Sequence, residues 1–144
     1  MAVSVYVDTC VFLNLWKQEI SEYGVPLWKR AQQFFDYVEA ESVPMIFSPF
    51  VIRELRHLAP AEMFATRLRA LNERGLLSEV RVNAVDYELA RLLHQEAGYG
   101  ISFFDSMHVA LSMRTDAVLI TRDRELLAFA RGRCRAALPE DFKL

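Results

Sequence analysis

Short apolar runs alternate along this chain with longer segments in which apolar positions recur at the helical period. The apolar runs predict buried strands over residues 3–7, 44–47, 117–121 and 134–138, with a short extended piece over 78–82. The intervening segments predict helices over residues 9–19, 27–40, 50–58, 60–74, 83–97, 102–113 and 123–130. Strands separated by helices require right-handed crossovers, which give a small parallel sheet with helices on both faces. The pattern therefore predicts a three-layer α/β fold.

Residues that favour helix starts and turns stand at the predicted boundaries. Ser48 precedes Pro49, which is the arrangement of an N-cap followed by a proline at the first helical position. Residues 83–86 and 102–105 each have the spacing of a capping box. Asp116 adjoins the start of the next strand and is predicted to be a turn residue.

The bulk composition describes one domain with a mild acidic balance. The 144 residues fit a single domain, residues 1–144, and a hydrophobic content of 53% is ample for its core. The formal net charge of −2 argues against a broad basic surface that binds nucleic acid by charge alone. Residues 114–144, however, hold seven Lys or Arg against five Asp or Glu. Bound divalent cations would also offset part of the acidic total, so a nucleic-acid substrate is not excluded.

The cysteines and the hydropathy of the chain indicate where in the cell the protein is expected. Cys10 and Cys134 are the two cysteines, which suggest neither a disulfide framework nor a thiolate metal site and favour a reducing, cytoplasmic location. The apolar start of the chain is short, is interrupted by Ser4 and lacks a charged flank, so we expect a buried strand there and not a signal peptide. No apolar run approaches the length of a membrane span, and we expect no membrane association.

Four acidic residues are predicted to reach one edge of the sheet. Asp8 directly follows the first strand, and Asp123 stands just past the strand over 117–121. Glu54 lies within two helical turns of the second strand, and Asp105 sits in a first helical turn, where the dipole favours a carboxylate. Ligands of open α/β sheets bind beyond the carboxyl ends of the strands. Clustered carboxylates raise each other's pKa, so a divalent cation is expected among them.

Glu54 gives the sharpest local signal. It falls inside an apolar sector of its helix, formed by Phe50, Val51, Leu55 and Leu58. A desolvated carboxylate without a partner costs at least ~2 kcal/mol, so a metal, a cation or a hydrogen-bond donor should meet it. A salt bridge to an Arg or Lys of another element explains Glu54 equally well when this residue is considered alone.

Helix capping is the alternative explanation of the other three acids. Asp8 and Asp123 can each cap the helix that follows, and Asp105 can complete a capping box with Ser102. A set of unrelated caps and ion pairs aimed at one edge is less probable than a shared purpose. His108 shares a polar seam of its helix with Asp105, but a lone histidine is more often a packing residue, so it is left outside the ligand set.

The arginines near the C-terminus suggest contacts with phosphate. Arg131, Arg133 and Arg135 alternate with other residues and would make one face of an edge strand basic, for which solvation is the simpler interpretation and a phosphate track the alternative. Arg122 and Arg124 flank the last of the four acids and are candidates for contacts with backbone phosphates.

Five segments of the chain are informative through their order and spacing. They are Val-Tyr-Val-Asp-Thr at 5–9, Ile-Arg-Glu-Leu at 52–55, Phe-Asp-Ser-Met-His-Val-Ala at 104–110, Thr-Asp-Ala-Val-Leu-Ile-Thr-Arg-Asp at 115–123 and Leu-Pro-Glu-Asp-Phe at 138–142. Together they resemble the PIN-domain ribonucleases, in particular the single-domain VapC-type toxins of prokaryotic toxin–antitoxin pairs. The resemblance spans nearly the whole chain.

This resemblance implies a PIN-like fold with an acidic pocket at the edge of the sheet and Mg²⁺ or Mn²⁺ supporting hydrolysis of RNA by an activated water. On the family pattern, the metal-binding and catalytic residues are Asp8, Glu54, Asp105 and Asp123. Thr9 and Thr121 match small hydroxyl positions that could hydrogen-bond a carboxylate or a metal-bound water, while Cys10 departs from the Asn or Ser often found at its position. The family also implies an antitoxin partner and a homodimer.

Two other functions are kept as alternatives. An aspartate-nucleophile phosphatase would use Asp8 as a covalent nucleophile, but such enzymes usually need a second acid two residues later, where Cys10 stands. A non-catalytic interaction module would use the surplus of apolar residues for protein binding. The presence of all four acids favours the ribonuclease.

Overall fold

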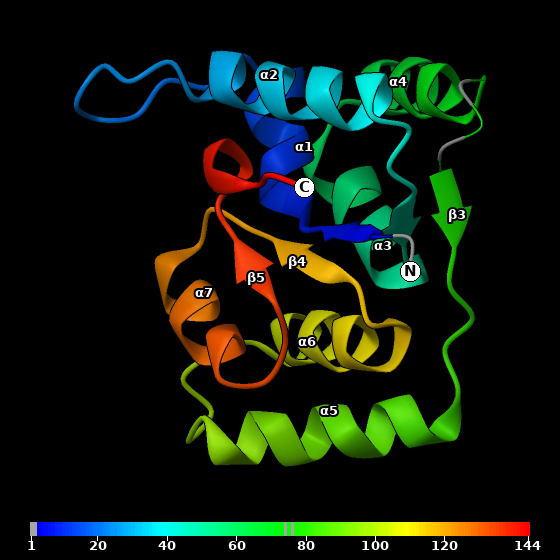
Figure 1. The fold of residues 1–144 in the computed structure, drawn as a ribbon, viewed down its shortest axis with the longest axis vertical. Helices are drawn as coiled ribbons and strands as arrows, with labels where there is room; N and C mark the ends of the chain where they lie inside the picture. The colour runs from blue at the N-terminus through cyan, green and yellow to red at the C-terminus, as the bar shows by residue number, and fades with distance from the viewer. Residues whose placement is uncertain (1–2, 74, 76) are drawn as a thin grey trace.

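A five-stranded parallel sheet lies at the centre of the protein, in the strand order β3-β2-β1-β4-β5 (Figure 1). The computed structural model describes residues 3–73, 75 and 77–144. Its strands are β1 (Val5–Val7), β2 (Met45–Phe47), β3 (Leu77–Glu79), β4 (Val118–Ile120) and β5 (Ala136–Ala137). Each of the four neighbouring strand pairs is parallel, as the alternation of strands and helices predicts.

Helices cover both faces of this sheet. They are α1 (Thr9–Trp16), α2 (Leu27–Ala40), α3 (Pro49–Leu58), α4 (Ala61–Glu73), α5 (Ala84–Glu96), α6 (Phe103–Thr115) and α7 (Arg124–Arg131), followed by the 3-10 helix η1 (Pro139–Asp141). Figure 1 shows α5 and α6 on one side of the sheet and α1 and α2 on the other, which confirms the three-layer α/β fold. Within the described part of the chain, none of these helices is long and apolar enough to cross a membrane.

The central strand and α6 form the most deeply buried part of the core. Val5, Tyr6 and Val7 have no exposed surface, because β1 is paired along both edges and covered on both faces. In α6 the seven residues 106–112 are all buried. A helix buried on all sides must supply partners for its polar side chains, and this requirement applies to His108.

The order of the strands reverses at β1, since β2 and β3 lie on one side of it and β4 and β5 on the other. The crevice beyond the carboxyl ends of the strands at such a reversal is the usual ligand site of an open α/β sheet. Here Val7 pairs with Ile120, and the backbone N–H of Asp8 donates to the Ile120 carbonyl at 2.9 Å. The residues that follow β1 and β4, Asp8 and Thr121, therefore meet at this crevice.

The predicted cap and turn residues occupy their expected places. The Ser48 side chain accepts a hydrogen bond from Val51 N at the start of α3. Asn83 and Asp86 form a reciprocal capping box at the start of α5. Asp116 is the C-cap of α6 and has a left-handed backbone, with φ of 54°. These local signals position α3 and α6, which carry two of the four acids.

The first helix is shorter than the predicted span of 9–19. It ends at Trp16, because Gln18 adopts the left-handed conformation with φ of 50°. The residues from Lys17 to Pro26 then form a loop between α1 and α2 that projects from the body of the protein in Figure 1.

The last strand is also shorter than the predicted span of 134–138, since β5 has two residues. Arg131 ends α7, and Arg133 stacks its guanidinium on Phe129, with the central carbon 3.8 Å from the ring centre. The predicted basic face of an edge strand therefore does not form, and Arg131, Arg133 and Arg135 instead line one shallow cavity beside Asp116.

Candidate active site

Asp8 lies at the carboxyl end of β1 and is almost completely buried, with 5% of its surface exposed. Its Oδ1 accepts a hydrogen bond from Thr9 N at 2.8 Å. Its Oδ2 accepts hydrogen bonds from Thr121 Oγ1 at 2.8 Å and from Cys10 Sγ at 3.3 Å. The hydroxyl contact expected of Thr121 is present, and Cys10 adds a thiol contact to the same oxygen. These donors fix the orientation of the Asp8 carboxylate.

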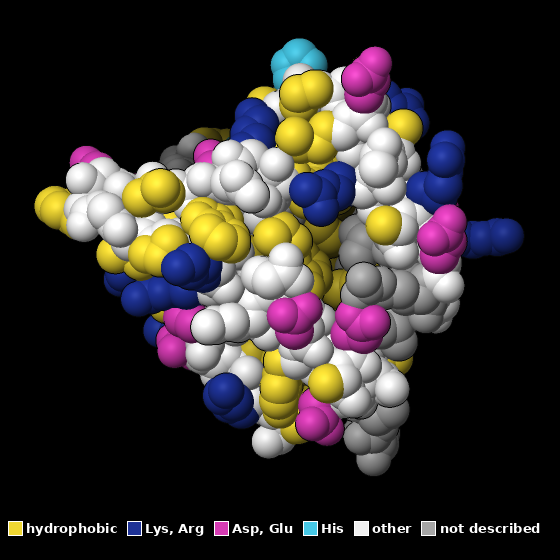
Figure 2. All heavy atoms as spheres, turned by 90° about the horizontal axis from the view of Figure 1, so that it is seen from above, with side chains coloured by type: hydrophobic (Ala, Val, Ile, Leu, Met, Phe, Trp, Pro, Cys, Tyr) yellow, Lys and Arg dark blue, Asp and Glu magenta, His cyan; other side chains and the backbone are white. Residues whose placement is uncertain are grey.

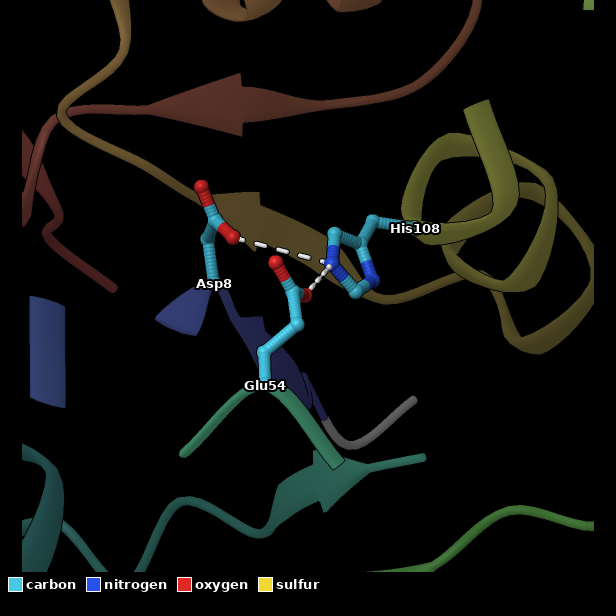
Figure 3. Close-up of side chains that lie close together, drawn as sticks. All are labelled: Asp8, Glu54 and His108. Atoms are coloured by element: carbon cyan, nitrogen blue, oxygen red, sulfur yellow. Dashed lines mark hydrogen bonds and ion pairs between the residues drawn. The ribbon is translucent and has the colours of Figure 1, made fainter. Parts of the chain in front are cut away.

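Glu54 projects from α3 toward Asp8, and both carboxylates face the imidazole of His108 (Figure 3). Glu54 Oε1 accepts from Thr9 Oγ1 at 3.1 Å and lies 2.9 Å from His108 Nε2. The same nitrogen lies 3.7 Å from Asp8 Oδ1. The partners that Glu54 requires within its apolar sector are therefore a histidine and a threonine. The salt bridge to an Arg or Lys, kept open from the sequence, is not among its contacts in the described residues.

His108 belongs to this site, although the sequence interpretation leaves it outside the ligand set. Its side chain has no exposed surface, and its Nδ1 lies 2.7 Å from Tyr6 Oη, which in turn lies 2.7 Å from Ser48 Oγ. The signal in the sequence is the polar seam that His108 forms with Asp105 on an otherwise apolar helix. The fold sets the His108 ring against both carboxylates, so the residue contacts the site through them, while its place outside the ligand set stays a prediction.

Opposing effects act on the pKa of His108. Burial lowers the pKa, whereas the hydrogen bond to Glu54 and the charges of the surrounding carboxylates raise it, and the net shift is upward. The raised pKa favours the imidazolium, which donates from Nε2 to Glu54 and from Nδ1 to Tyr6. Tyr6 can then donate its own proton to Ser48. In this arrangement the side chains of Glu54, His108, Tyr6 and Ser48 each have a hydrogen-bond partner.

Asp105 lies in the first turn of α6, where its backbone N–H donates to Ser102 Oγ at 3.0 Å. Burial raises the pKa of its carboxyl group to about 6, and repulsion from the other three acids, chiefly Asp8, adds to this effect, while His108 opposes it. The capping contact and the electrostatic coupling therefore exist together. The other three acids predicted from the sequence all lie within electrostatic reach of Asp105.

Asp123 stands at the outer side of the group and is exposed. Its Oδ1 caps α7 by accepting hydrogen bonds from Glu125 N at 3.0 Å and Leu126 N at 3.2 Å. Its backbone N–H donates to Thr121 Oγ1 at 3.1 Å. Asp123 is therefore the N-cap of α7, as the capping alternative predicts. Its charge also contributes to the raised pKa of Asp105.

One set of side chains in the described residues has the spacing of a metal site. The ligand atoms of Asp8, Glu54 and His108 lie within 4.8 Å of one another. Carboxylate oxygens are the preferred ligands of Mg²⁺ and Mn²⁺, and Asp8 and Glu54 supply them, while His108 directs a ring nitrogen at Glu54. Burial and then repulsion from the other acids raise the pKa of Asp105, and a cation would relieve that repulsion. The donor set therefore fits Mg²⁺ or Mn²⁺.

The two arginines expected to contact phosphate have different surroundings. Arg122 Nε donates to Asn14 Oδ1 at 2.6 Å, and its Nη1 donates to both carboxylate oxygens of Glu140 at 3.0 Å. Only 14% of its side chain is exposed. These internal contacts occupy Nε and Nη1 of Arg122, and its contact with phosphate stays a prediction. Arg124, the first residue of α7, is exposed at the edge of the site.

Comparisons with known proteins agree on the fold. The family model described as PIN domain matches residues 5–132. The crystal structure of FitAcB from Neisseria gonorrhoeae is similar, with a TM-score of 0.64 and 17% identity over 96% of this chain and 99% of that chain. The structure of FitAB bound to the IR36 DNA fragment gives a TM-score of 0.66 and 15% identity over 97% and 98%. The crystal structure of PAE2754 from Pyrobaculum aerophilum has a TM-score of 0.54 and 16% identity over 94% of this chain and 90% of that chain. None of the curated proteins matches the sequence.

Proposed function

Because this chain belongs to the PIN-domain family, whose members are generally metal-dependent nucleases, we propose that it is an Mg²⁺- or Mn²⁺-dependent endoribonuclease. The observation that carries the proposal is the convergence of Asp8 and Glu54 on His108 at the crevice beyond β1 and β4. The raised pKa of Asp105 beside them supports a site built to receive a cation.

In this proposal Asp8 and Glu54 bind the ion directly. Asp105 adds negative charge beside the ion, and Asp123 lies at the solvent-exposed side of the site. The bound ion would supply an activated water and would neutralise charge that develops on the scissile phosphate. Thr9, Thr121 and His108 act through the carboxylates, since each donates to one of them. Arg124 is the side chain proposed to meet a backbone phosphate, because it is exposed next to Asp123.

The geometry disfavours the phosphatase alternative. Asp8 Oδ1 accepts a hydrogen bond from Thr9 and Oδ2 accepts from Thr121 and Cys10, contacts that suit a metal ligand as well as a nucleophile, so the alternative depends on a second acid near Asp8. The position two residues later holds Cys10, and burial and the nearby charge of Asp8 raise the pKa of that thiol. Cys10 therefore cannot replace the missing second acid as a proton donor and acceptor near neutral pH.

We further propose that the protein is the toxin of a VapBC-type pair, acts in the cytoplasm and binds a cognate antitoxin. The sequence resemblance to VapC-type toxins supports this role, as does the similarity of the fold to FitAB, which was solved with bound DNA. Figure 2 shows hydrophobic side chains around a hollow on the face formed by α2 and α4. We propose this hollow as the binding site of the antitoxin. It is lined by Phe12, Leu15, Trp16, Gln32, Phe35, Arg67 and Ala70.

A homodimer is proposed on separate grounds. Val85 and Leu92 lie seven residues apart on one face of α5 and are 64% and 51% exposed. Apolar side chains that share one helix face are suited to an interface between two copies of the chain.

An RNA cleavage assay tests the enzymatic proposal. The wild type and Asp8→Asn are incubated with mixed RNAs in the presence of Mn²⁺, of Mg²⁺ or of EDTA. Cleavage is expected from the wild type with either metal, and its loss is expected in EDTA and in the variant. Asp36→Asn, an exposed aspartate of α2, is the matched control and should retain activity. Identical behaviour of the wild type and Asp8→Asn would remove the catalytic claim.

A further inference from the structure

A second cavity, of about 350 Å³, lies beside the turn that carries Asp123, because Arg122 and Arg124 both line it. It lies between the loop that joins α1 to α2 and the start of α7, and its wall includes Tyr23, Arg30, Arg122, Arg124 and Leu138. Arg124 directly follows Asp123, so the cavity and the acidic site share the turn after β4. A chain bound across the acids would reach this cavity next.

The loop presents an aromatic ring to solvent from an ordered backbone. Tyr23 is 87% exposed. Ser21 Oγ accepts hydrogen bonds from Tyr23 N at 3.3 Å and from Val25 N at 3.0 Å, and Ser21 N donates to Val25 O at 2.8 Å. Gly24 has φ of 81°, which the tight turn requires and other residues rarely adopt. The loop therefore holds Tyr23 in place without burying it.

Positive charge prevails on the wall of this cavity. Glu140 is shared by two guanidinium groups, since both Arg30 and Arg122 donate to it at 3.0 Å. Arg122 Nη2 is buried and has no hydrogen-bond partner among the described residues. Arg124 adds an exposed positive charge, and Glu22 is the other acid of the wall. Three arginines against two glutamates make this cavity cationic beside a site that is strongly acidic.

From these features we infer that the cavity binds the nucleotide next to the scissile phosphate of a single-stranded RNA. The phosphate of this nucleotide lies at Arg124, and its base stacks on Tyr23. The inference rests on the proposed ribonuclease function. Exposed aromatic rings beside cationic grooves bind single strands with little base preference, because every base has a face that can stack. The cavity therefore positions RNA without selecting a particular base.

Binding of a fluorescent single-stranded octamer RNA of mixed sequence tests this subsite. Fluorescence anisotropy in EDTA, which prevents metal-dependent cleavage, gives the Kd at several salt concentrations. Tyr23→Ala should raise the Kd at least about fivefold, and Tyr23→Phe should stay within about twofold of the wild type. Arg124→Ala should raise the Kd and reduce the slope of log K against log salt by about 0.7, the loss of one phosphate contact to a single strand.

Two control variants replace a tyrosine and an arginine that lie outside the cavity. Tyr99 is 65% exposed and Arg91 is exposed on α5, and replacement of either residue by Ala should leave RNA binding as in the wild type. Equal binding by the wild type, Tyr23→Ala and Arg124→Ala would overturn the inference, as would equal losses in the controls or no RNA binding by the wild type. Cleavage by the wild type with unaltered binding in the cavity variants would reject only the subsite. Weakened binding in those variants without any cleavage would support the subsite and reject the nuclease.

Discussion

His108 Nε2 lies 2.9 Å from Glu54 Oε1, although the two residues are 54 positions apart and lie on different helices. The imidazole has no exposed surface, and its other ring nitrogen contacts Tyr6. His108 therefore holds Glu54 in a fixed place beside Asp8 and offsets part of their negative charge before a cation binds. It is a positioning residue that acts through the carboxylates.

Replacement of His108 by Ala should destabilise the protein by about 2–4 kcal/mol. The change leaves a cavity in the core and removes the partner of Glu54 and of the Tyr6 hydroxyl. Urea unfolding followed by circular dichroism measures the difference in the free energy of unfolding. His57→Ala is the control, because His57 is exposed on α3 and its replacement should change stability by about 0.5 kcal/mol or less. Equal effects of the two substitutions would refute the role given to His108.

Asp105→Asn should stabilise the metal-free protein near neutral pH. The pKa of Asp105 is about 6 in the folded chain, above its ordinary value of 3.8, so the folded state binds this proton more tightly than the unfolded state. Stability that this proton provides at low pH is lost as the pH rises from about 4 to about 6. Asn carries no charge, so the variant should gain about 1–2 kcal/mol at pH 7.5, after allowance for solvent screening, and little at pH 4.

Thermal unfolding at the two pH values measures this effect. The variant should also gain less stability than the wild type when Mn²⁺ is added, because one acid of the site is lost. Asp36→Asn controls for the loss of an exposed carboxylate and should show neither change. A metal-free Asp105→Asn protein that is less stable than the wild type at pH 7.5 would show that burial and repulsion of the Asp105 charge are not the dominant effects.

The pair between Arg122 and Glu140 should be stronger than the pair between Arg30 and Glu140. The Arg122 side chain is 14% exposed and makes two contacts with Glu140, whereas the Arg30 side chain is 46% exposed and makes one. Double-mutant cycles in urea should give a coupling energy of about 1–3 kcal/mol for the buried pair and under about 1 kcal/mol for the exposed one. Coupling energies that are equal within error would contradict this ranking.

Local signals in the sequence predicted most of the fold. The helix over residues 27–40 has the predicted bounds, because its apolar positions keep the helical period throughout. Ser48 and the Asn83–Asp86 pair mark helix starts through contacts that span a few residues, so they are visible in the sequence itself. The early end of α1 was missed because it depends on the backbone conformation of Gln18, a residue without a strong preference for the left-handed region.

Contacts between remote residues limited the prediction of the site. The carboxyl edge of a parallel sheet collects residues that follow strands, so Asp8 could be placed from the sequence. The pairing of His108 with Glu54 depends on the packing of α6 against α3, which no local pattern specifies. Arg122 presented the same difficulty, since its partners Asn14 and Glu140 are 108 and 18 positions away. The residue types were visible in the sequence, but the choice of partner required the fold.

A crystal structure of the protein soaked with Mn²⁺, with anomalous diffraction data, tests the central claim most directly. The account predicts an anomalous peak about 2.0–2.6 Å from carboxylate oxygens of both Asp8 and Glu54, the range of oxygen ligands to such cations. Glu54 should remain in contact with His108. A structure at saturating Mn²⁺ with no peak beside these carboxylates, or with the ion bound elsewhere, would contradict the account.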